Sequence, residues 1–107
     1  MRRVGVVVKI LPEKVEEYER LHADVPKPVL DMLRAAHFSN YSIFRLDLIL
    51  FGYFEYLGTD LDADLARIAA DPATQEWWKL TDPCQEPMPG APPGELWSDL
   101  TQIFFME

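Results

Sequence analysis

The chain has few of the residues that build covalent bridges, phosphate loops or metal centres. Its single cysteine, Cys84, excludes a disulfide within the chain. Five glycines are present, but they form no glycine-rich loop of the kind that cradles phosphates. Two histidines and one cysteine, without the spacing of metal ligands, argue against a zinc site. We therefore expect neither a zinc site nor a phosphate-binding loop.

Positive charge and long apolar runs are also scarce. The 10 Lys and Arg residues stand against 18 Asp and Glu residues, for a formal net charge of −8 at pH 7. Such a field repels nucleic acids and anionic membranes, so we expect neither as a partner. No apolar run is long enough to cross a bilayer, and Lys9 interrupts the short run near the N-terminus. A reducing, cytoplasmic setting is the resulting expectation.

Hydrophobic periodicity and turn residues predict a single domain over residues 1–107. Pro12 suits the first turn of a helix, and Asp60 suits the N-cap of another. A tight turn at 47–48 is typical of a hairpin between two aromatic-rich segments. The predicted strands are 2–10, 40–46, 49–57 and 96–106, the predicted helices are 12–23, 28–37, 61–70 and 72–82, and a proline-rich loop covers 82–95.

The order of these elements predicts an α+β protein with the ferredoxin-like βαββαβ fold, an antiparallel sheet with helices on one face. The third strand carries apolar or aromatic side chains on both of its faces, where a half-solvated strand would alternate with polar residues. We expect another copy of the chain to cover the second face. The prediction is a homodimer, paired sheet to sheet or edge to edge in a barrel-like assembly.

The stretch "EEYERLH" places Tyr18 and His22 one helical turn apart on the face that also carries Val15. A histidine on an apolar face is usually a core residue satisfied by one hydrogen bond. Two polar groups on one buried stripe, however, need several partners, and a ligand rich in hydroxyls would supply them. Imidazole also exchanges protons near neutral pH, so His22 is the candidate catalytic residue.

Three aromatic side chains are candidates for binding a ligand. Trp77 and Trp78, in "EWWK", point about 100° apart on a helix, so both flank a pocket only along the helix edge. The alternative places one indole in the core and the other at the rim of the domain. Tyr41, in "NYSIF", begins a strand, where half-buried tyrosines are common as packing residues.

His37, at a helix end, fits a C-terminal cation better than a catalyst.

These motifs together resemble the L-rhamnose mutarotase family. The shared landmarks are "EEYERLH", "NYSIF", "EWWK" and a closing "LTQIF", in the same order over nearly the full length. The stretches "VPKPVL" and "WWKLTDPC" depart from the usual family pattern, and the tail "PMPGAPPGELW" is similar to the related L-fucose mutarotases.

The resemblance implies a cofactor-free, dimeric mutarotase-like domain. Its implied activity is the interconversion of the α and β anomers of a 6-deoxy-L-sugar by ring opening and closing, with L-rhamnose first and L-fucose next. It further implies His22 as the proton donor, with Tyr18, Tyr41, Trp77 and Trp78 around the monosaccharide.

Two interpretations from other classes remain open. Small dimeric ferredoxin-like domains include cofactor-free monooxygenases, which hold flat aromatic substrates. A non-enzymatic module that binds a small molecule is the other alternative. An RNA-binding domain of the same topology is excluded by the net charge of −8 and by the missing basic-aromatic signature.

Overall fold

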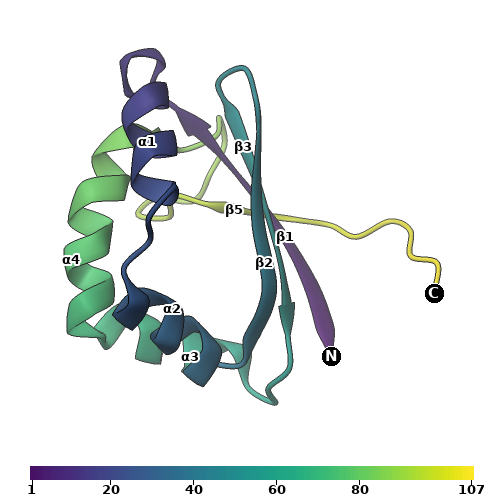
Figure 1. Ribbon diagram of the computed structural model, residues 1–107. Helices are drawn as coiled ribbons and strands as arrows, with labels where there is room; N and C mark the ends of the chain where they lie inside the picture. The colour runs from purple at the N-terminus through teal and green to yellow at the C-terminus, as the bar shows by residue number, and fades with distance from the viewer.

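The computed structural model describes residues 1–107. The chain forms an antiparallel five-stranded sheet, and all of its helices lie on one side of that sheet (Figure 1). In chain order the elements are β1 (Arg2–Ile10), the 3₁₀ helix η1 (Pro12–Lys14), α1 (Val15–His22), α2 (Lys27–Ala35), β2 (Phe38–Leu46), β3 (Ile49–Tyr56), α3 (Leu61–Ala70), α4 (Pro72–Thr81), η2 (Asp82–Cys84), β4 (Gln85–Glu86) and β5 (Ser98–Leu100).

The sheet order is β2-β3-β1-β4, with β5 also paired to β1. This is the ferredoxin-like arrangement, so the predicted fold class is confirmed. The hairpin turn lies at 47–48 as predicted, and Asp47 takes a φ of 50° there. The predicted caps form locally: the Asp60 carboxylate accepts from the Ala63 N–H, and α4 begins at Pro72.

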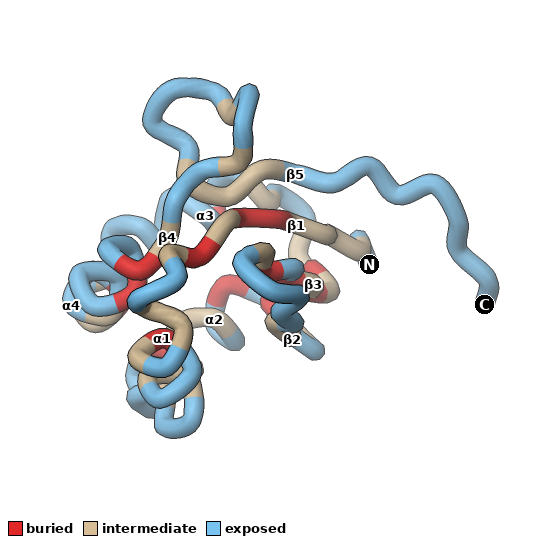
Figure 2. The backbone as a smooth tube through the Cα atoms, turned by 90° about the horizontal axis from the view of Figure 1, so that it is seen from above, coloured by how far each residue is buried: buried red, intermediate tan, exposed pale blue.

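The core lies between the helices and the face of the sheet that we call the inner face. It divides into two clusters of buried residues: Val8, Ile10, Tyr18, Leu50 and Cys84 in the first, and Ala36, Phe38, Phe54, Tyr56 and Ile68 in the second. Viewed from above, the buried segments gather on the central strands and on the helix sides that face them (Figure 2). The opposite, outer face carries no helix.

A β-bulge in β2 determines which of its side chains face the helices. Ser39 pairs with Glu55 and Ser42 with Tyr53, so Asn40 and Tyr41 together lie opposite one residue of β3. Asn40 takes the required left-handed backbone, with a φ of 49°. The extra residue shifts the alternation by one, and Tyr41 thereby joins Phe38 on the inner face.

Two of the predicted segments differ from the structure. The proline-rich segment 82–95 is not wholly irregular, because β4 adds two residues to the edge of β1. The closing strand is much shorter than the predicted 96–106: only Ser98–Leu100 pair with β1, and residues 101–107 extend away from the body (Figure 1). No helix is long and apolar enough to span a membrane.

Candidate functional site

His22 lies at the C-terminal end of α1 with one ring nitrogen engaged and the other unbonded within the protein. Its Nδ1 lies 2.9 Å from the backbone carbonyl oxygen of Tyr18. A carbonyl only accepts, so Nδ1 carries the hydrogen and Nε2 presents its lone pair. The imidazole packs against the Tyr18 ring, with centroids 4.2 Å apart, and edge-on against Trp77, with centroids 5.2 Å apart.

Tyr18 is buried, with 4% of its surface exposed, and its hydroxyl accepts a hydrogen bond of 2.8 Å from Nε2 of Gln85. No protein acceptor takes the hydroxyl's own hydrogen. Burial raises the pKa of Tyr18 above its ordinary value, and the neighbouring Tyr41 raises it further. The phenol is therefore neutral at physiological pH, and its hydrogen is available to a ligand oxygen.

Tyr41 approaches the site from the sheet. Its ring lies 5.5 Å from that of Phe54 and 6.0 Å from that of Phe38, between centroids. Burial of the phenol group raises its pKa, although 40% of the residue's surface is exposed. Tyr41 is thus a neutral hydroxyl at the open side of an aromatic wall, close enough to Tyr18 to affect its titration.

The two adjacent tryptophans of α4 have different environments. Trp77 is half-buried and contacts the His22 ring. Trp78 is 37% exposed and makes no ring contact with His22, Tyr18 or Tyr41. The structure therefore brings Trp77 to the histidine and leaves Trp78 at the rim.

Four side chains from α1, α4 and β4 thus lie together, and we call them the His22 cluster: Tyr18, His22, Trp77 and Gln85.

α1 is held over the sheet by a contact that crosses from helix to strand. Nε of Arg45 lies 2.7 Å from Oε1 of Glu19, and Arg45 follows the β2 bulge on the inner face. The interaction lies at the surface, where an ion pair contributes little to stability. It links the helix that carries Tyr18 and His22 to the second strand of the sheet.

A second histidine forms a separate cluster, which we call the Asp64 cluster: His37, Tyr56, Asp64 and Arg67. The buried Asp64 carboxylate accepts from the Tyr56 hydroxyl at 2.5 Å, from Nδ1 of His37 at 2.9 Å and from Arg67 at 2.8 Å. The hydrogen bond from Tyr56, and then that from His37, lowers the pKa of Asp64 to about 2.

The prediction that His37 acts as a helix-terminal cation is wrong, because its ring is turned to Asp64 of α3. It follows α2 with a φ of 70°, and its Nδ1 lies 2.9 Å from Oδ2 of Asp64.

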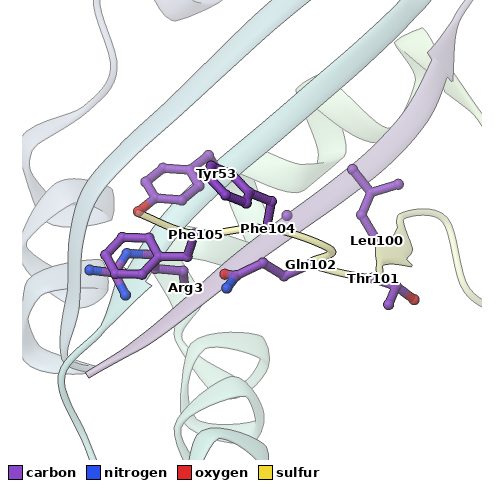
Figure 3. Close-up of a pocket in the computed structure, with 8 residues that line it drawn as sticks. Arg3, Tyr53, Leu100, Thr101, Gln102, Phe104 and Phe105 are labelled. Atoms are coloured by element: carbon purple, nitrogen blue, oxygen red, sulfur yellow. The ribbon is translucent and has the colours of Figure 1, made fainter. Parts of the chain in front are cut away.

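The outer face carries two hollows of its own. One, of about 380 Å³, lies between β1, β3 and the tail, where the Phe105 ring covers the Arg3 guanidinium and Tyr53 lies beside Phe104 (Figure 3). The other, of about 430 Å³, is formed largely by the loop 88–92 and Val7. Neither contains a member of the His22 cluster. No group of three His, Cys, Asp or Glu side chains is positioned to hold a metal ion.

Sequence patterns alone missed two side chains near the His22 cluster. Gln85 falls in the proline-rich segment, and no local signal marks its hydrogen bond to a residue 67 positions earlier. Trp97 packs against the first core cluster, which includes Tyr18. Residue type could have pointed to Trp97, since a tryptophan that follows a proline-rich segment usually packs its large ring against an apolar surface.

Comparison with known proteins identifies the family. The family model described as L-rhamnose mutarotase matches residues 3–106. The chain belongs to this family. It is 29% identical to an L-rhamnose mutarotase from Oceanobacillus iheyensis, with all of both chains covered. It is 32% identical to another from Ligilactobacillus salivarius, covering 98% of this chain and 97% of that one. The resemblance drawn from the motifs is thus confirmed.

Solved structures support the same fold. An L-rhamnose mutarotase from Formosa agariphila superposes over the full length of both chains with a TM-score of 0.79 and 20% identity. Tetracenomycin F2 cyclase from Streptomyces glaucescens also covers both chains fully, with a TM-score of 0.69 and 14% identity. At these identities the likeness concerns the fold, and members of this fold differ in chemistry.

Proposed function

We propose that the chain is a cofactor-independent mutarotase that interconverts the α and β anomers of a 6-deoxy-L-sugar, with L-rhamnose as the first substrate and L-fucose as the next. One observation carries the proposal beyond family membership. The His22 imidazole lies between the Tyr18 phenol and the Trp77 indole, and its Nε2 is the ring nitrogen left for a ligand.

The reaction requires only proton transfers. One proton reaches the ring oxygen and another leaves the anomeric hydroxyl, so the ring carbon–oxygen bond breaks and an aldehyde forms. The carbonyl end rotates, and the reverse transfers close the ring with the opposite configuration. Atoms and electrons balance without an oxidant or a leaving group. A positioned general acid and base contributes about 10²–10⁴ in rate.

In this proposal His22 donates a proton to the ring oxygen from its imidazolium form, in which Nε2 as well as Nδ1 carries hydrogen. Its Nδ1 hydrogen is committed to the Tyr18 carbonyl, which fixes the ring orientation, so Nε2 gains and loses the transferred proton. The Trp77 indole packs on His22 and offers an apolar wall to the C–H face of a sugar.

The two phenols hold sugar hydroxyls. Tyr18 accepts from Gln85 and keeps its own hydrogen for the ligand. Because burial raises its pKa, it relays a proton by accepting one as it gives up another, without ionising. Tyr41 binds a second hydroxyl from the sheet side. Trp78 is exposed on α4, and its contact with the sugar stays a prediction.

Magnetization exchange between the α and β signals of the free sugar tests the proposal. We expect the chain to accelerate exchange for L-rhamnose, more weakly for L-fucose, and little for common aldoses. Saturable sugar binding without exchange would instead support a binding module. Oxygen uptake with an aromatic substrate, and no effect on any sugar, would support a monooxygenase.

A homodimer is part of the proposal. The outer face exposes Phe44 and Leu46 by 66% and 65%, and the tail exposes Ile103 and Phe104 by 94% and 77%. Large apolar side chains exposed on one sheet face and on the tail beside it favour an interface. A second copy would cover the bare face and give the tail a strand to pair with.

Light scattering tests the assembly. At micromolar concentration we expect twice the chain mass, and the monomer mass for a Phe104→Ser/Ile103→Ser variant. A native monomer would contradict the homodimer without affecting the proposed chemistry.

A cytoplasmic setting is also proposed, since the only thiol, that of Cys84, is unbridged and buried.

A further inference from the structure

A third tryptophan, Trp97, lies on the inner face of the sheet. In β5, Ser98 pairs with Val7 and Asp99 with Val6. The register therefore brings Trp97 level with Val8, a residue of the first core cluster, and alternation turns both side chains to the helices. Trp97 packs against that cluster and is half-buried, so part of its surface stays open.

The indole of Trp97 lies against Gly52 on the sheet. A Cβ at this position would clash with Cγ2 of Val6 at 2.8 Å and would be in van der Waals contact with Cζ3 of Trp97 at 3.4 Å, so a side chain larger than alanine would meet the indole. Gly52 interrupts an inner-face row that otherwise reads Leu50, Phe54 and Tyr56, all buried. The missing side chain lets the six-membered ring of Trp97 lie against the middle of β3.

This position is between the two phenols of the candidate site. Alternate residues of a strand lie about 7 Å apart, so Leu50 and Phe54 flank the ring of Trp97 on either side along β3. Leu50 belongs to the same core cluster as Tyr18, whereas Phe54 contacts Tyr41. Trp97 thus lies on the sheet between the side of the site that holds Tyr18 and the side that holds Tyr41.

We propose that Trp97 forms the sheet-side floor of the sugar site and is a specificity-determining residue, with its indole against the apolar C–H face of the bound sugar. The inference rests on the proposed mutarotase function and extends it. Two 6-deoxy-L-sugars that differ in the orientation of ring hydroxyls present different C–H faces, so a flat floor discriminates between them. Trp77 would then contact the sugar from the helix side and Trp97 from the sheet side.

The ¹H–¹⁵N spectrum of the native chain tests this contact. The three tryptophans give three indole signals, assigned from Trp77→Phe, Trp78→Phe and Trp97→Phe variants. We expect the Trp97 signal to move on saturation with L-rhamnose. If the Trp77 signal moves and the Trp97 signal does not, the inference is wrong and the proposed function stands. If no signal moves and no sugar is exchanged, both are wrong.

Selectivity distinguishes a floor from simple packing. We expect Trp97→Leu to change the ratio of kcat/KM for L-rhamnose over L-fucose by about threefold or more, mainly through KM, because an aromatic face is lost. The matched control is Leu65→Ala at an exposed position of α3, which should leave the ratio unchanged. A Trp97→Leu variant that melts at a lower temperature but keeps the native ratio would show that Trp97 only packs.

Discussion

The two histidines each lie beside a tyrosine, but the two clusters use their hydrogen bonds differently. In the Asp64 cluster both oxygens of the shared carboxylate are engaged: Tyr56 donates to Asp64 and accepts from the Asp60 N–H, and Nδ1 of His37 and Arg67 donate to the same carboxylate. In the His22 cluster, Nε2 of His22 and the hydroxyl hydrogen of Tyr18 have none.

The charges of the two clusters also differ. Asp64 is an ionised carboxylate whose pKa is lowered to about 2, and it ties α3 to β3 and to the segment after α2. The partners of His22 and Tyr18 are neutral: a carbonyl, an amide and an indole. A charged cluster whose carboxylate is fully engaged stabilises the fold, whereas a neutral cluster with an unused acceptor and an unused donor suits a ligand with many hydroxyls. The same residue types therefore stand in two different environments, and we propose that only the His22 cluster binds a ligand.

The largest expected contrast is between the two imidazoles. His22→Asn should lower anomer exchange by about 10²–10⁴, because the proposed proton donor is lost. His37→Asn should keep exchange within about twofold and lower the melting temperature, since asparagine tolerates the left-handed backbone at 37 but loses the imidazole bond to Asp64. Exchange NMR and thermal melts of both variants measure this. Equal exchange by His22→Asn and the native chain would remove the proton-donor role.

The paired tyrosines give the next contrast. Tyr18→Phe should lower kcat/KM about tenfold, the effect of one lost hydrogen bond to the substrate. Tyr56→Phe should leave exchange intact and lower the melting temperature by roughly 4–8 °C, since it removes a buried partner of Asp64. The reverse pattern, with activity lost at Tyr56, would mean that the Asp64 cluster is part of the active site.

Gln85 should affect anomer exchange only by orienting the Tyr18 hydroxyl. Replacing it with leucine removes the donor that orients the phenol, and we expect about a fivefold loss of kcat/KM. In a Tyr18→Phe/Gln85→Leu double variant the loss should equal that of Tyr18→Phe alone, because both changes remove the same interaction. Additive losses would indicate that Gln85 touches the sugar itself.

The smallest effect concerns stability at low pH. Because the pKa of Asp64 is lowered in the folded state, its contribution is complete above the unfolded pKa of about 4 and is lost as the pH falls through about 2. Between these values the melting temperature should fall more steeply for the native chain than for Asp64→Asn. Asp62→Asn, at an exposed position of the same helix, is the control and should follow the native curve.

The sequence predicted those features that depend on neighbouring residues. Asp60, Pro72 and the turn at 47–48 act within a few positions, and the i,i+4 spacing placed Tyr18 and His22 on one inward face. Features that depend on distant pairing were not predictable in the same way. The bulge at Asn40 that turns Tyr41 inward, the bond from Gln85 to Tyr18 and the seat of Trp97 on Gly52 all depend on sheet register. The early end of the closing strand was not predicted either, since its pairing with β1 stops at Leu100.

Long-range ¹H–¹⁵N spectra of the two imidazoles test the central claim most directly, because they report which ring nitrogen carries hydrogen and which one meets the ligand. At a pH where both rings are neutral, we predict the Nδ1–H tautomer for His22, with its Nε2 signal moving when L-rhamnose is added and the His37 signals unchanged. An Nε2–H tautomer at His22, or a response to the sugar at His37 alone, would contradict the account.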